Sequence, residues 1–142
     1  LETLVSLDPS LAILHAESQA GVGECLHQLQ AVGIKAGVAL LEPTQPFQVQ
    51  KFIQMAEHVL IFTGKLGYNG GQFQAPMLEK IKAVRKINPG VEIGVDGGIN
   101  PDNIRLAVSS GADVLYVGGY ISSSSDPETA FANLAKLVEQ TI

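Results

Sequence analysis

A repeated alternation of short apolar runs with longer amphipathic stretches constrains this chain more than any other feature of its sequence. Runs that are hydrophobic almost throughout are typical of strands in a parallel sheet with both faces covered. The alternation therefore predicts an α/β fold in which crossover helices join parallel strands. The predicted strands are residues 11–15, 36–41, 59–63, 91–96 and 114–118, and the predicted helices are residues 22–32, 46–56, 75–87, 102–109 and 127–140.

Glycine and proline mark where several of these helices start and stop. Gly33 and Gly111 each follow a helical stretch, where glycine is favoured just past the last turn. Asn100-Pro101 and Asp126-Pro127 each place an N-cap residue before a proline in the first helical position. No linker, low-complexity segment or charge block interrupts the series, so we expect one domain.

The composition fits one globular unit and excludes several classes of partner. Of the 142 residues, 46% are hydrophobic, which is enough apolar material for a core. The 14 acidic residues outnumber the 9 basic ones, and no basic cluster is present, so we expect no nucleic-acid partner. No apolar run is long enough to suggest a membrane partner. The single cysteine, Cys25, is expected to be a packing residue in a cytoplasmic protein.

The positions of the glycines favour a barrel over an open sheet. A dinucleotide-binding open sheet would carry a G-x-G-x-x-G turn after its first strand, and this chain has none. Its glycines gather instead after the last three predicted strands, within residues 67–71, 97–98 and 118–119. A TIM (β/α) barrel binds phosphate in the loops after its final strands, where backbone N–H groups converge on the anion. We therefore predict a partial TIM barrel of about five parallel strands.

All three of these loops are candidates for chemistry, and residues 116–121 have the spacing of a final-strand phosphate turn. The long loop at residues 63–73 could wrap a phosphate or act as a lid, although a plain surface loop remains the alternative. Asp96 ends a buried strand directly before Gly97-Gly98, and a carboxylate at the C-terminal end of a barrel strand points into the active-site mouth. Its alternative role is to cap the next helix, for which Asn100 is better placed.

Several motifs together resemble the ribulose-phosphate 3-epimerase family, from near residue 1 to the end of the chain. The family's V-D-G-G-I strand end stands at 95–99, its G-A-D-V strand start at 111–114 and its paired small-residue turn at 118–119. Its glycine loop precedes an L-E-K-I helix, here residues 78–81. The stretches at 14–17 and 37–44 resemble the family's fourth and fifth strands. The resemblance implies one barrel domain, 1–142, that lacks its three N-terminal strands.

The resemblance also implies a reaction, which is metal-assisted epimerisation of a ketopentose phosphate at C3. In that family a divalent metal, zinc, iron or manganese, stabilises the enediolate between two acid/base carboxylates. Asp96 would be both a metal ligand and one of those carboxylates. The other carboxylate would belong to the absent strands, so we expect this chain to be inactive alone, with the metal present only in the complete protein.

The remaining ionisable candidates are judged from their positions in the sequence. His15 ends a strand and could line the site or make structural hydrogen bonds, and Lys65 could reach a phosphate or remain solvated. His27 and His58 are expected on the surface. The family's methionine and proline positions near residue 62 differ here, which leaves the sugar open. The residues expected to bind the phosphorylated substrate are Gly67, Asn69, Gly70, Gly71, Gly97, Gly98, Gly118 and Gly119.

Two other functions remain open from the sequence. One is a non-catalytic homologue that only binds a phosphate ligand, and the other is a different phosphate-barrel enzyme, such as a sugar-phosphate decarboxylase or isomerase. An incomplete barrel would also leave unpaired strand edges and an uncovered interior, which favours association. We therefore expect a homo-oligomer.

Overall fold

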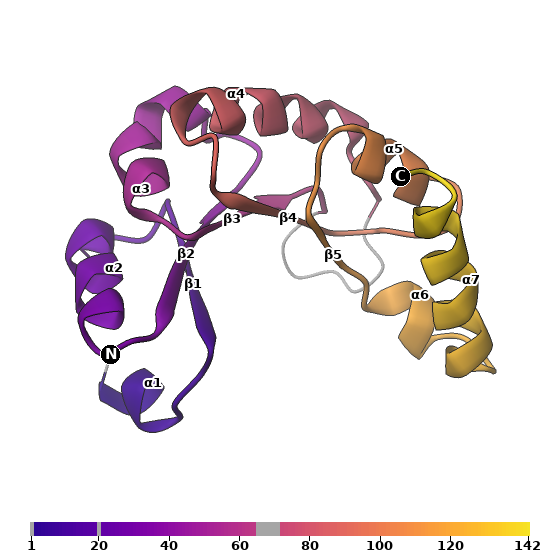
Figure 1. The fold of residues 1–142 in the computed structure, drawn as a ribbon, viewed down its shortest axis with the longest axis horizontal. Coiled ribbons are helices and arrows are strands. Elements are labelled where there is room, and N and C mark those ends of the chain that lie inside the picture. Colours follow the sequence, from indigo (N-terminus) through magenta and orange to yellow (C-terminus); the bar gives the residue numbers. More distant parts are fainter. Residues whose placement is uncertain (1, 20, 65–71) are drawn as a thin grey trace.

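The computed structural model describes residues 2–19, 21–64 and 72–142. Its described strands form one sheet of 5 parallel strands in the order β1-β2-β3-β4-β5. The strands are β1 (Leu11–His15), β2 (Lys35–Leu40), β3 (His58–Phe62), β4 (Glu92–Asp96) and β5 (Val114–Tyr116). The sheet curves into an arc, and helices follow its outer side (Figure 1). The predicted α/β class and the parallel βα series are confirmed.

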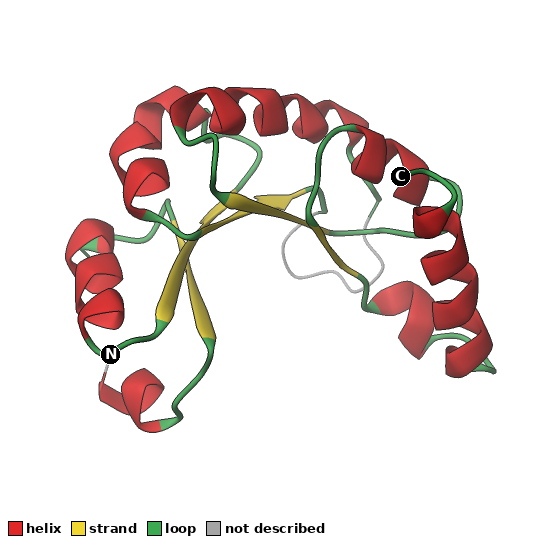
Figure 2. Cartoon of the chain, in the orientation of Figure 1, coloured by secondary structure: helices red, strands yellow, loops and turns green. Residues whose placement is uncertain are grey.

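Helices alternate with the strands along the described chain (Figure 2). Two of the predicted helices begin with a 3-10 turn at a proline-containing segment, since proline fits the first turn of a helix. The elements are α1 (Glu2–Ser6), α2 (Val22–Ala31), η1 (Pro46–Val49), α3 (Gln50–Met55), η2 (Ala75–Leu78), α4 (Glu79–Ile87), α5 (Ile104–Ser109), α6 (Gly119–Ser122) and α7 (Pro127–Glu139). The short α6 was not predicted, because the sequence suggested only a turn there.

The core lies between the outer face of the sheet and the helices. Side chains alternate between the two faces of a strand, and on β3 the fully buried Val59 and Ile61 flank the half-buried Leu60. Ile53 of α3, Ile81 of α4 and Ile104 of α5 are buried in the same cluster. The outer face of the sheet therefore carries the apolar core and is covered by the helices.

Three of the four predicted helix boundaries are confirmed. Gly33 and Gly111 have φ values of +82° and +96°, and the Asp126 side chain accepts a hydrogen bond from the Thr129 N–H. The fourth prediction was wrong, because α5 begins at Ile104 with Asn103 as its N-cap. Asn100 instead accepts from the Asp102 N–H and closes a local turn ahead of the helix.

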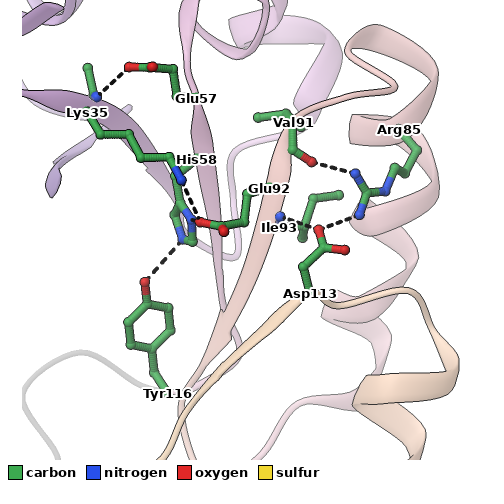
Figure 3. A network of polar contacts seen from close by, with 10 residues as sticks. Lys35, Glu57, His58, Arg85, Val91, Glu92, Ile93, Asp113 and Tyr116 are labelled. Atoms are coloured by element: carbon green, nitrogen blue, oxygen red, sulfur yellow. Dashed lines mark hydrogen bonds and ion pairs between the residues drawn. The ribbon is translucent and has the colours of Figure 1, made fainter. Parts of the chain in front are cut away.

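A chain of polar side chains crosses the inner face of the sheet (Figure 3). Glu92 Oε2 lies 3.0 Å from Lys35 Nζ and 2.7 Å from His58 Nδ1, and His58 Nε2 lies 3.3 Å from the Tyr116 hydroxyl. With a proton on Nδ1, His58 donates to Glu92 and accepts from Tyr116. His58 is 0% exposed, so its predicted surface position was wrong. Its register partner on β4 is Glu92, and this pairing compensates the burial of the imidazole.

The His58 ring leaves room only for glycine on the neighbouring strand. A Cβ added at Gly94 would lie 2.6 Å from His58 Nε2 and 2.7 Å from Tyr116 Cε2. The absence of a side chain at Gly94 therefore lets the His58 and Tyr116 rings pack against β4.

None of the helices in the described ranges combines the length and the apolar content needed to cross a membrane.

We predict that Gly94→Ala destabilises the protein by about 1–3 kcal/mol, because the methyl group overpacks a filled site. Gly90→Ala is the matched control, since a Cβ there would meet no heavy atom within 4 Å. Urea unfolding followed by circular dichroism measures both free energies. Equal unfolding midpoints for the two variants would contradict the tight packing around His58.

Candidate functional site

The turns that follow β3 and β4 are joined directly to each other. Thr63 Oγ1 lies 2.9 Å from the Asp96 carbonyl and 2.7 Å from the Gly97 carbonyl, and the Thr63 N–H donates to the Asp96 carbonyl at 2.6 Å. Thr63 is fully buried. Because the C-terminal ends of parallel strands meet at one edge of the sheet, these contacts fix one side of the barrel mouth.

Gly97 and Gly98 are both in the left-handed region, with φ values of +114° and +71°. A Cβ at Gly97 would lie 2.2 Å from Gly64 N, so only glycine lets the two turns approach this closely. Asn103 Nδ2 donates to the Gly98 carbonyl at 2.9 Å, which anchors the far end of the turn to the start of α5. The turn is therefore held at both ends.

Asp96 stands at the C-terminal end of β4, beside this turn, and its side chain is half-buried. Burial raises the pKa of the Asp96 carboxyl above its ordinary value, and a hydrogen bond from the Gly97 N–H offsets this only in part. A carboxyl group whose pKa rises in a partly buried site can exchange protons more readily near neutral pH.

The third glycine turn begins next to Asp96. Tyr116, the last residue of β5, is the register partner of Asp96, and Gly118-Gly119 follows two residues later. A Cβ at Gly118 would meet no heavy atom within 4 Å, so the backbone there is open to an approaching group. The structure thus brings the ends of β3, β4 and β5 together at one edge. The candidates Lys65, Gly67, Asn69, Gly70 and Gly71 lie outside the described residues.

Comparison with known proteins identifies the family. The profile of the ribulose-phosphate 3 epimerase family matches residues 1–122. The chain belongs to the ribulose-phosphate 3-epimerase family. The cytoplasmic isoform of ribulose-phosphate 3-epimerase from Oryza sativa is 32% identical over 143 residues, which cover 98% of this chain and 63% of the rice protein. The enzyme from Aquifex aeolicus is 30% identical over 88% of this chain and 58% of its own length. The chain thus spans less than two thirds of these relatives.

Solved structures support the barrel fold. The 3-hexulose-6-phosphate synthase from Salmonella typhimurium superposes with a TM-score of 0.78 at 16% identity, over 99% of this chain and 67% of that protein. The 3-keto-L-gulonate-6-phosphate decarboxylase from Vibrio cholerae gives a TM-score of 0.75 at 13% identity, over 99% of this chain and 66% of that protein. At such low identities the likeness concerns the fold alone, and it supports the predicted TIM-barrel architecture.

His15 lies on an edge strand of the described sheet, three strands away from the D-G-G-I turn that follows β4. It ends β1, its side chain is 47% exposed, and its Nδ1 lies 3.7 Å from Glu17 Oε2. Glu17 in turn accepts a hydrogen bond from the Leu41 N–H at 3.0 Å. The position at a strand end is compatible with either role foreseen for His15, which is to line the site or to make structural hydrogen bonds.

The described residues do not supply a metal centre. Among residues 2–19, 21–64 and 72–142, no group of three or more His, Cys, Asp and Glu side chains is placed to hold a metal ion. Asp96 could contribute one oxygen ligand, but a divalent ion needs several. The residues present therefore do not by themselves fit the metal that the family resemblance implies.

Sequence reasoning named Thr63 only as the start of the loop at 63–73 and Lys80 only within the L-E-K-I stretch, and it missed the hydrogen bonds with which both residues hold turns. Thr63 stands at a strand end, where a hydroxyl carries little signal by itself. Lys80 did leave a signal, because the sequence places it on the same apolar face as the buried Met77 of η2 and Ile81 and Val84 of α4. A lysine at such a position is a candidate for a buried, fully paired ammonium group.

We predict that Asp96→Asn raises the stability of the protein at pH 7. The pKa of Asp96 is higher in the folded protein than its ordinary value of 3.8, so the folded state holds the proton more tightly. The contribution of this group to stability is present below pH 3.8 and is lost as the pH rises through the folded pKa. Urea midpoints measured from pH 7 down to pH 3 should therefore converge for the two proteins.

Asp102→Asn is the matched control, because it removes the same charge from an exposed position in the following turn. It should leave the urea midpoint nearly unchanged at both pH values. An Asp96→Asn protein that is no more stable than the wild type at pH 7 would refute the burial cost assigned to this carboxyl.

Proposed function

We propose that this chain carries the phosphate-binding part of a ribulose-phosphate 3-epimerase-like enzyme that acts on a ketopentose phosphate. The observation that carries the proposal is the position of Asp96, whose pKa is raised by burial beside two joined turns. Membership of the family and the names of its relatives support this substrate class. Because the chain spans only part of those relatives, the activity is proposed for the complete protein.

In the proposed reaction, Asp96 exchanges a proton with C3 of the sugar. Epimerisation removes the proton next to a carbonyl from one face and returns a proton to the other, so it needs two acid/base groups. The raised pKa of Asp96 suits one of these roles. Glu17 does not suit the other, because burial is outweighed by hydrogen bonds from Thr44 and from backbone N–H groups, and its pKa is lowered. We propose that the second carboxylate comes from residues beyond the described ones.

The divalent metal belongs to the proposal for the complete protein only. Asp96 would be one ligand, and the others would come from outside the described residues. The roles proposed for residues of this chain require no metal step. A binding-only homologue remains the second candidate, because the described residues form neither a metal set nor a second acid/base group.

The phosphate of the substrate is proposed to bind at the turns 97–98 and 118–119. Glycines allow the backbone N–H groups of a turn to approach an anion closely, and consecutive N–H groups can form an anion-binding concavity. Gly97 and Gly98 have the backbone conformation for such a turn, and Gly118 leaves open space beside it. The glycine loop at 67–71 is proposed to complete the phosphate site.

We predict that Gly118→Asp weakens the binding of inorganic phosphate about tenfold or more, because it places a negative charge against the anion. The backbone at Gly118 accommodates a side chain, so the fold should survive. Isothermal titration calorimetry measures the affinity, and Gly90→Asp is the control with the same charge change in another open turn. Equal affinities for the two variants would exclude phosphate from this turn.

We also predict that the 142-residue chain alone has little or no epimerase activity. The reason is that we assign no second acid/base group among the described residues. A coupled assay with D-ribulose 5-phosphate measures the turnover. Turnover on the order of 1 to 1000 per second, which is ordinary for enzymes, would contradict this assignment.

A homo-oligomer and a cytoplasmic location complete the proposal. Within the described residues β1 pairs only with β2, and β5 pairs only with β4, so each leaves one edge free. Free strand edges beside a half-exposed inner face favour association between copies. The cytoplasmic assignment rests on the single cysteine, Cys25, which cannot form an internal disulfide.

A further inference from the structure

A buried lysine holds the turn that follows β2. Lys80 of α4 is only 7% exposed. Its Nζ donates to the carbonyl groups of Leu41, Glu42 and Thr44 at 2.6, 2.9 and 2.8 Å. An ammonium group has three protons to donate, so these three bonds use all of them. All three acceptors lie within residues 41–45, which we call the β2 turn.

A carboxylate binds the same turn. Glu17, in the turn after β1, accepts from the Leu41 N–H at 3.0 Å and from the Thr44 side chain. Lys80 and Glu17 also attract each other, although burial still lowers the pKa of Lys80 overall. The β2 turn is thus held by an anion in the turn after β1 and by a cation on a helix.

Burial of the Lys80 ammonium costs free energy, and an apolar side chain could fill the same space without that cost. Removing a charge from water is unfavourable even when the charge is paired, and apolar replacements of buried ions are often as stable or more stable. The neighbouring buried positions of α4, Ile81 and Val84, are apolar. A lysine at position 80 therefore points to a need for a fixed β2 turn, beyond the need to fill space.

The position of the β2 turn in the sheet suggests why the turn is held in place. The strand β2 lies next to β3, whose end is joined to Asp96 through Thr63. The phosphate turns lie in the other direction, after β4 and β5. A sugar phosphate held at those turns and reaching toward the carboxyl of Asp96 would extend toward the β2 turn.

We propose that Lys80 and Glu17 are positioning residues that fix the β2 turn as the sugar-side wall of the ligand site. This inference rests on the proposed function, because it takes the phosphate to bind at residues 97–98 and 118–119. It predicts a division of labour. The glycine turns set the affinity for the phosphate group, and Lys80 with Glu17 sets the affinity for the sugar attached to it.

The test compares two ligands on the same variants by isothermal titration calorimetry. Lys80→Met should weaken the binding of D-ribulose 5-phosphate about tenfold, since a loosened wall misplaces the sugar. The affinity for inorganic phosphate should stay unchanged. Lys82→Met is the matched control, because Lys82 lies on the same helix with a side chain 70% exposed, and it should change neither affinity.

A second variant keeps the test decisive if Lys80→Met unfolds. Glu17→Gln preserves the volume of the side chain while removing its charge, and it should also weaken only the sugar phosphate. Loss of both ligands in parallel, or of neither, in variants that stay folded by circular dichroism would overturn the positioning role. Failure of the unmodified chain to bind phosphate would instead contradict the proposed function, and this inference with it.

Discussion

The structure depends on the burial of one face of a parallel sheet. Val59 and Ile61 of β3 and Ile93 and Val95 of β4 are fully buried beneath the helices. A shift of one residue in either strand would turn these side chains inward and drive His58 or Glu92 into the apolar layer. The hydrophobic layer therefore sets the register, and the register sets which residues meet on the inner face and at the strand ends.

The register brings different groups together at the two ends of the strands. Near the N-terminal ends, Lys35, His58 and Glu92 satisfy one another, and Gly94 makes room for the imidazole. At the C-terminal ends, polar side chains hold turns together by hydrogen bonds to backbone carbonyls. Thr63 binds the Asp96 carbonyl in this way, and Lys80 binds the β2 turn. This leaves Asp96 as a half-buried carboxyl with a raised pKa, which is a cost to stability at neutral pH and suits the proton transfer proposed for it.

Conformation at the mouth also follows from these close approaches. Gly97 lies so close to Gly64 that there is no space for a side chain. Because Thr63 bonds to the Gly97 carbonyl, the turns after β3 and β4 cannot move apart without losing that hydrogen bond. The β2 turn is held as firmly by Lys80 and Glu17. Turns that are held by hydrogen bonds in this way can position a small ligand, which is the use proposed for them.

The sequence by itself determined the α/β class, the order of the strands and of the helices between them, and the D-G-G-I turn, because each depends on periodicity or on residues a few positions apart. Asp126 and Thr129 illustrate this, since a cap joins residues separated by three positions. Only the tertiary structure decided the burial of His58, whose partners Glu92 and Tyr116 are 34 and 58 residues away. It also decided the role of Lys80, whose three acceptors are backbone carbonyls and carry no signal in side-chain chemistry. Distant pairing of buried polar groups depends on register and packing, and no local pattern encodes it.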